Sequence, residues 1–504
     1  MENPEPLKAL PAGETERGIT REGAAFLALA LGLLIASYLL MSIFPAWQSP
    51  LGFLLITAAV YVITTAAALL LGARPGLLSA AALAIGLIAA MYRMVHGCAQ
   101  ADIFPVMLIS LFVYAYYVLT LFSNHSGRIG CGLLMDFVKG LSYMFVSFHE
   151  FFIAIFKPKG SRKRPFAVLL VTGGVLASAI FVIAVASLLS YDANFKALLP
   201  EISLEDVLSA ILKLSLAVPL AAMLFSAVAS SRKRLFPALS SEETVSKAGS
   251  QVKVIPAILI VMPVAALLIV YALFFISQRA YYLSAFTHTL PEGYSAAEYA
   301  REGFFQLLAV TIINLVLIVL LGCFMRNRSR AADILRRVLA ALLSAAALLL
   351  ITTAVSKMLL YIDRFDLSRA RLEATVFMLF LAAVFAAVLL SSVFKRVKAA
   401  PIIAVAAVIF FVAFSLTNTN RFVAKYNVDM YLSGKHSDID VEYLENNLGW
   451  SSAPELRRLS ECAQGDVRER AERSYENMKA RSGEVEWYRG DIPYYTALKD
   501  FSDD

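Results

Sequence analysis

The side chains best suited to chemistry gather in two stretches of the second half of the chain. The stretch 278–305 contributes several tyrosines together with Arg279, Glu298, Tyr299 and Arg301. The stretch 357–371 contributes Lys357, Tyr361, Arg364 and Arg371. Cations beside tyrosines can bind an anionic ligand, but they also form the belt that anchors helices at a membrane surface. We favour the belt. The alternatives are an anionic ligand site and a rim on which the C-terminal tail docks.

Lys213 is the best candidate for a charge inside an otherwise apolar segment. Ionisable residues within membrane spans are costly and often mark an ion or substrate path. Lys213 lies only about one and a half turns from the end of its segment, so its long side chain can also reach the membrane surface. We favour this second interpretation, and the scarcity of such charges argues against a charged transport site at mid-membrane.

The motifs that identify most membrane enzymes and pumps are missing from the sequence. There is no G-x-x-x-x-G-K-[S/T], H-E-x-x-H, C-x-x-C or G-x-S-x-G sequence. The five histidines are scattered, so neither a metal site nor a cofactor is predicted. Glu298, Asp363 or Asp366 could serve as a general base, but no matching acid or nucleophile accompanies them. The sequence therefore leans against an enzyme, and no catalytic residue is assigned.

Membrane helices are the elements that must position these residues. Hydrophobic residues make up 59% of the 504-residue chain and charged residues 16%, against roughly 45–50% and about 25% in soluble domains. This composition excludes a soluble multidomain protein and a disordered chain. An all-α, polytopic bundle is predicted, because apolar windows long enough to cross a bilayer recur about eleven times. They are 24–44, 51–72, 76–95, 104–122, 166–190, 207–229, 255–277, 304–324, 333–353, 372–394 and 400–417.

The distribution of basic residues predicts the orientation of the bundle. Alternate connections hold 24 Lys and Arg on one side and seven on the other, and basic loops remain in the cytoplasm. We therefore predict a cytoplasmic segment at 1–23, a transmembrane domain at 24–417 and an extracytoplasmic tail at 418–504. The basic excess is divided among short loops, which favours contact with anionic lipid and argues against nucleic acid.

The apolar segment 131–156 carries a polar stripe that includes Asp136, Lys139, Tyr143 and Ser147 at spacings of three and four. This pattern is typical of an amphipathic helix. Counting it as a twelfth span would place every later basic loop outside. We therefore predict an interfacial helix on the cytoplasmic face, with its phenylalanines in lipid.

The tail has a different character, with 17 acidic and 12 basic residues. We predict three or four short helices, including one begun by a capping box at Ser452 and Glu455 and another over 466–481. The opposite charges of the tail and the outer loops predict docking near Arg301 and Arg364, with 418–431 as a hinge. Cys98 and Cys462 lie on the same predicted side, but independent thiols are favoured over a disulfide. The predicted tail core is Tyr431, Tyr443, Leu444, Leu448, Trp450, Leu456 and Leu459.

Three groups of residues resemble a bacterial family of multi-pass membrane proteins known only as a domain of unknown function. They are the stretch 281–305 with its Tyr-Ala-Arg-Glu-Gly-Phe-Phe sequence, the stretch 357–372, and the polar pattern from Asn418 to Leu444. The resemblance implies the bacterial plasma membrane. It implies no activity and no catalytic residues.

Three functions stay open, in decreasing order of preference. The first is a regulatory, sensory or accessory scaffold, whose tail contacts a protein partner and whose spans contact the lipid bilayer. The second is a transporter or lipid-handling protein for an anionic substrate, and the third is a membrane enzyme. A solid bundle near Lys213 would argue against transport, whereas a deep polar cavity there would favour it.

Overall fold

The computed structural model describes residues 20–43, 49–97, 103–122, 132–156, 204–233, 256–277, 296–325, 329–485 and 490–502. These ranges are helical and contain no strand. Nine helices within them are long and apolar enough to cross a membrane. The prediction of an all-α, polytopic architecture is thereby confirmed.

The first helical bundle is built around α9 (Leu204–Lys233). This helix packs against α1, α4, α5 and α6, and alanines on its inner face are completely buried, among them Ala217, Ala221 and Ala222. Small residues allow helix backbones to approach closely in a membrane, where packing drives association. The other helices of this bundle are α1 (Arg21–Ile43), α2 (Pro50–Leu70), α3 (Leu77–His96), α4 (Ile103–Phe122), α5 (Gly132–Val146) and α6 (Phe148–Phe156).

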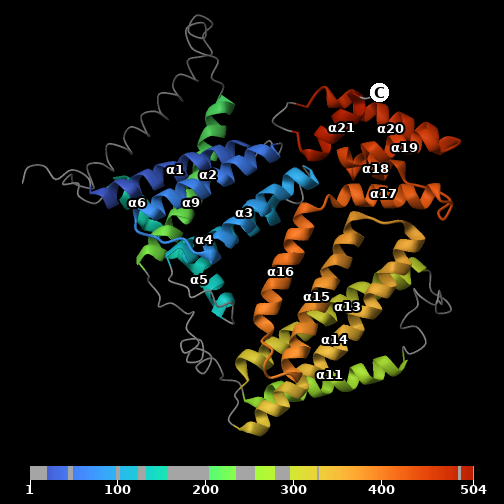
Figure 1. Ribbon diagram of the computed structural model, residues 1–504, viewed down its shortest axis with the longest axis horizontal. Helices are drawn as coiled ribbons and strands as arrows, with labels where there is room; N and C mark the ends of the chain where they lie inside the picture. The colour runs from blue at the N-terminus through green and yellow to red at the C-terminus, as the bar shows by residue number, and fades with distance from the viewer. Residues whose placement is uncertain are drawn as a thin grey trace, which may run out of the picture.

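The second bundle is built around α14 (Arg330–Phe365), which packs against α11, α13 and α15. Its partners are α11 (Ala257–Ser277), α13 (Ala296–Val319), a π-helical turn η2 (Leu320–Phe324) and α15 (Arg369–Val393). The last apolar helix, α16 (Ala399–Leu416), packs against both α15 and α3. It therefore lies between the two bundles (Figure 1).

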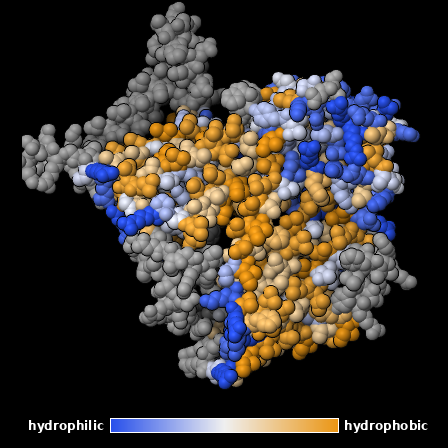
Figure 2. Space-filling model, in the orientation of Figure 1, coloured by the Kyte–Doolittle hydropathy of each residue, from blue (hydrophilic) through white to orange (hydrophobic). Residues whose placement is uncertain are grey.

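Five α-helices and one 3-10 turn follow α16 and cover one end of the second bundle (Figure 1). Hydrophilic side chains gather over them, whereas apolar side chains cover the two bundles (Figure 2). The predicted tail core is confirmed: its four leucines are buried, and its two tyrosines and Trp450 pack around them. The elements are α17 (Thr419–Leu432), α18 (Val441–Asn446), η3 (Gly449–Ser452), α19 (Ala453–Cys462), α20 (Asp466–Ser482) and α21 (Ile492–Ser502).

Two of the eleven predicted windows need separate mention. Window 166–190 lies outside the described residues. Window 304–324 lies within α13 and η2, where the apolar stretch Gln306–Gly322 is shorter than the other spans. The other nine windows coincide with the nine long apolar helices, whose bounds differ from the prediction by a few residues except at α14, which extends to Phe365.

The amphipathic segment 131–156 is divided into α5 and α6 at Ser147. Part of its polar stripe is buried: Tyr143 and Ser147 pack against α9, where Ser226 and Ser230 form hydrogen bonds to them. Phe145 and Phe152 are exposed. Two serines of α9 thus satisfy the Tyr143 carbonyl and the N–H and hydroxyl of Ser147, so this part of the stripe forms a helix contact.

Two local predictions for the tail are wrong. Residues 419–432 form helix α17, capped by the Asn418 side chain, which accepts a hydrogen bond from the Arg421 N–H; they are not a hinge. The capping box at Ser452 does not form. The Ser452 hydroxyl instead donates to the carbonyls of Leu444 and Gly449, because the preceding 3-10 turn places those acceptors nearby. Helix α19 still begins at Ala453.

Candidate functional site

The structure describes only some of the cations and tyrosines that the sequence offers as a ligand site or docking rim, which we call the cationic rim. Arg279 lies outside the described residues, and Glu298, Tyr299 and Arg301 lie in the first turns of α13, with side chains that are not described. Lys357 is buried on α14, and Arg364 is exposed near the end of the same helix. Lys213 is half-buried on α9, in the other bundle, and lines neither large cavity of the described part of the chain.

Arg371 and Tyr361 are brought together, but they stabilise their own loop. The Arg371 guanidinium lies 4.1 Å from the centroid of the Tyr361 ring, a cation–π contact. The same guanidinium donates to the carbonyls of Phe365 and Asp366 at the end of α14. Arg371 thus stabilises the turn between α14 and α15, where Asp366 has a φ of +63°.

Helix α17 packs against this same turn. The Asn427 side chain is buried, accepts a hydrogen bond from the Leu367 N–H and donates one to the Leu367 carbonyl, both at 2.9 Å. The hydroxyl of Tyr443 accepts from the Arg369 N–H at 3.0 Å, and His436 pairs with Asp366. The tail therefore contacts the turn mainly through neutral hydrogen bonds, whereas the sequence predicted ion pairs.

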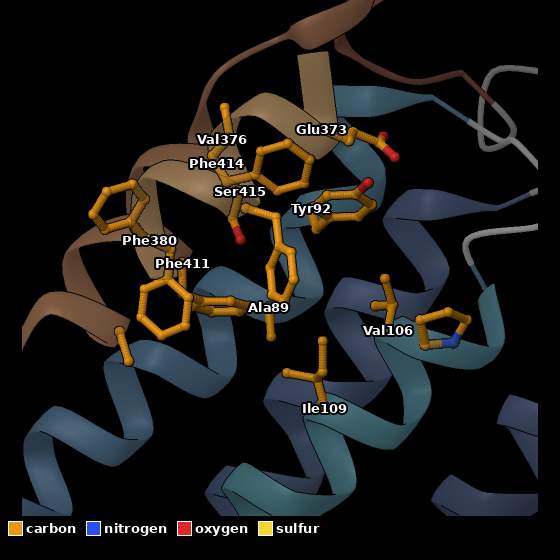
Figure 3. A pocket seen from close by; sticks show the side chains of 14 residues that line it. Ala89, Tyr92, Val106, Ile109, Glu373, Val376, Phe380, Phe411, Phe414 and Ser415 are labelled. Atoms are coloured by element: carbon orange, nitrogen blue, oxygen red, sulfur yellow. The ribbon is translucent and has the colours of Figure 1, made fainter. Parts of the chain in front are cut away.

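An apolar cavity of about 630 Å³ lies where the two bundles meet. Helices α3 and α4 line one side, and α15 and α16 line the other (Figure 3). Its volume is within the roughly 300–1,000 Å³ range of small-molecule sites. Six of its 14 lining residues are aromatic, namely Tyr92, Phe377, Phe380, Phe410, Phe411 and Phe414.

Polar groups mark one end of the apolar cavity. Glu373 and the hydroxyl of Tyr92 lie on the same side of it (Figure 3). Arg369 bridges them: its Nε donates to Glu373 at 2.7 Å, and its Nη2 donates to the Tyr92 hydroxyl at 3.0 Å. Ser415 also lines the cavity, and its buried hydroxyl has no hydrogen-bond partner among the described residues.

A second cavity of about 450 Å³ lies between the end of α3 and the tail helices. Its wall is far richer in polar groups than that of the apolar cavity, and we call this second space the polar cavity. The wall includes Asn420, Asn446, Asn447, Trp450, Glu484 and Asp491. Asn420 is 5% exposed, and its Nδ2 donates to the His96 carbonyl at 3.3 Å. Its Oδ1 is buried and has no hydrogen-bond partner in the described part of the chain.

His96 forms the boundary between the two cavities. His96 lines the polar cavity, and its ring stacks on Tyr92 at 4.0 Å and lies 5.5 Å from Phe414. Tyr92 and Phe414 both line the apolar cavity. One layer of side chains thus separates an apolar space from a polar one. This arrangement suits a molecule with an apolar chain and a polar head.

Asp491 lies in the wall of the polar cavity and caps α21, accepting a hydrogen bond from the Tyr494 N–H at 2.8 Å. Burial raises the pKa of Asp491 to about 6, and the hydrogen bonds and the charge of Arg93 offset only part of this effect. Arg93 is itself buried, in the last turn of α3. The Arg93 charge thus partly balances the carboxylate at this end of α3.

Residues 30–459 match the family described as Domain of unknown function (DUF4153). The chain belongs to the DUF4153 family. No curated protein and no solved structure matches the chain. The family match confirms the resemblance identified in the sequence, and with the apolar helices it makes this an integral membrane protein.

The residues that match the DUF4153 family include both walls of the apolar cavity. They also include the part of the polar cavity that contains Asn420 and Trp450. Asp491 and Glu484 lie beyond it. Sequence reasoning missed both cavities. A signal was present, because His96 directly follows the predicted window 76–95 and Asn420 comes three residues after the window 400–417. Those two window ends lie on the same predicted side of the membrane.

Proposed function

We propose that this DUF4153 protein binds a membrane lipid, with an acyl chain in the apolar cavity and the head toward the polar cavity. The observation that carries the proposal is the boundary formed by His96, Tyr92 and Phe414 between an apolar space and a polar one. Apolar cavities with a few convergent polar groups are typical of ligand sites.

The location of the apolar cavity supports a lipid as its occupant. It lies between helices that are long and apolar enough to cross a membrane, and α16, which forms one wall, has only 6% of its apolar stretch buried. A groove between such helices is open to the acyl chains of the surrounding bilayer, which are as apolar as its wall.

The geometry favours the lipid-handling interpretation over the scaffold and enzyme interpretations. A scaffold does not require adjoining apolar and polar cavities, and no group of three metal-ligating side chains occurs in the described residues. We propose the plasma membrane as the location, with the N-terminus in the cytoplasm and the tail outside, supported by the 24 to seven asymmetry of basic residues. The lipid bilayer is then the first partner that we propose, and a protein bound by the tail is the second.

Ala407→Phe is expected to reduce the amount of lipid that co-purifies with the protein by about tenfold or more. Ala407 lines the cavity from α16, so a phenyl ring there occupies space needed by several methylenes. Bound lipid per protein would be measured by mass spectrometry of organic extracts after detergent purification.

Val408→Phe provides the matched control. Val408 is the next residue on α16, is 40% exposed and does not line the cavity. It should retain lipid at the native level. Equal lipid content in both variants and in the native protein would refute binding in this cavity.

A further inference from the structure

The wall of the polar cavity holds a buried hydrogen-bond acceptor that has no partner among the described residues. The Asn420 Oδ1 is buried without a partner among the described residues, and the Asn420 Nδ2 is already used by the His96 carbonyl. Asp491 and Glu484 add carboxylates, and no lysine or arginine lines the cavity within the described residues. A bound group that donates a hydrogen bond would satisfy the Asn420 Oδ1.

This acceptor argues against a phosphate. An ionised phosphate diester brings only acceptor oxygens, which cannot satisfy the Asn420 Oδ1. Phosphate sites are usually built from arginine, lysine or a row of backbone N–H groups. A head that donates hydrogen bonds is therefore a better match for the Asn420 acceptor than an anionic one.

A cation fits less well than a neutral donor. The charge of Asp491 is partly balanced by Arg93, which is in the last turn of α3 and acts on the carboxylate electrostatically. Glu484 is exposed, so water screens its charge. What remains unsatisfied is a neutral acceptor, the buried Asn420 Oδ1, for which a hydroxyl group is a matched donor.

An aromatic wall completes the cavity. Trp450 is half-buried and its ring meets that of Tyr494 edge to face, with centroids 5.3 Å apart. Indole combines a large apolar surface with one N–H donor. A sugar ring has the complementary character, with apolar C–H groups on its faces and hydroxyls around its rim, and C–H groups pack well on aromatic rings.

We infer that the polar cavity binds a neutral, hydroxyl-rich head, such as a sugar ring, carried by the lipid whose chain occupies the apolar cavity. The inference rests on the proposed function and specifies its substrate class. The side chains assigned to the head are Asn420, Asn446, Asn447 and Trp450, with Asp491 and Glu484 as additional acceptors.

The test uses the full-length protein in detergent and an equimolar mixture of three lipids with identical acyl chains. The lipids are a monoglucosyl diacylglycerol, a phosphatidic acid and a diacyl ammonium lipid. Native mass spectrometry should find the glucosyl lipid bound in preference to the other two. Asn420→Leu and Asn447→Ala should each reduce that preference by about five- to tenfold and leave chain-dependent binding in place. Asn447 is exposed, so its variant remains informative if Asn420→Leu does not fold.

The possible results separate this inference from the proposed function. Preferential binding of the phosphatidic acid or the ammonium lipid would overturn the inference and leave lipid binding intact. Loss of all three lipids in Ala407→Phe, but not in Val408→Phe, supports the shared chain site. Retention of no lipid by the native protein would overturn both. Free glucose is also added as a competitor. If it competes as well as the glucosyl lipid does, the acyl chain adds nothing to binding, and the inference that a lipid carries the sugar would be overturned.

Discussion

Asn427→Leu is expected to destabilise the packing of α17 on the turn between α14 and α15 by about 2–6 kcal/mol. The substitution removes two hydrogen bonds and leaves the buried N–H and carbonyl of Leu367 without partners. Each unsatisfied buried group costs about 1–3 kcal/mol, and leucine has a similar volume, so the effect is one of hydrogen bonding.

Thermal unfolding in detergent and proteolysis of the tail would measure this effect. The variant should unfold at a lower temperature and should be cut faster in the segment between α17 and α18. Asn477→Leu is the matched control, because Asn477 is exposed on α20 and such surface changes usually cost no more than about 0.5 kcal/mol. Equal behaviour of the two variants would show that the Asn427 contacts do not hold the tail in place.

The second large effect is a dependence of stability on pH that originates at Asp491. Its pKa is about 6 in the folded protein, against an ordinary value of 3.8. The folded state therefore binds more protons than the unfolded state between these values, so stability should fall as pH rises from about 4 to 6 and then level off. The difference in pKa corresponds to about 3 kcal/mol.

Asp491→Asn should remove this fall, since asparagine stays neutral and can still cap α21. The measurement is the unfolding temperature of native protein and variant at several pH values between 4 and 7. The variant should gain stability relative to the native protein as pH rises. Glu476→Gln, at an exposed position on α20, should follow the native curve. Parallel curves for Asp491→Asn and the native protein would contradict the assignment.

The architecture could be predicted because a membrane span is recognised from the composition of one continuous stretch of sequence. Windows such as 372–394 and 400–417 contain the length and apolarity that a bilayer demands, and they reappear as α15 and α16. Helix α20 was likewise predictable, since 466–481 is a charged run that stops before a glycine. These features depend on neighbouring residues alone.

The cavities could not be predicted, because they depend on contacts between distant segments. His96 and Asn420 are 324 residues apart in sequence and meet only because α16 packs against α3. The cationic rim was misleading because some of its side chains have partners that the sequence does not show. Arg371 has the chemistry of an anion ligand, but its guanidinium is occupied by Tyr361 and by two carbonyls of its own turn. Residue type alone does not reveal such a partner.

Photolabelling with a lipid that carries a diazirine on its acyl chain is the most direct test of binding between the two bundles. After irradiation of the protein in nanodiscs, labelled peptides should contain residues of the apolar cavity on α3 and α16, including Tyr92 and Phe414. Ala407→Phe should suppress this labelling, and Val408→Phe should not. Labels spread over exposed faces such as that of α11, unchanged by Ala407→Phe, would contradict a lipid site between the bundles.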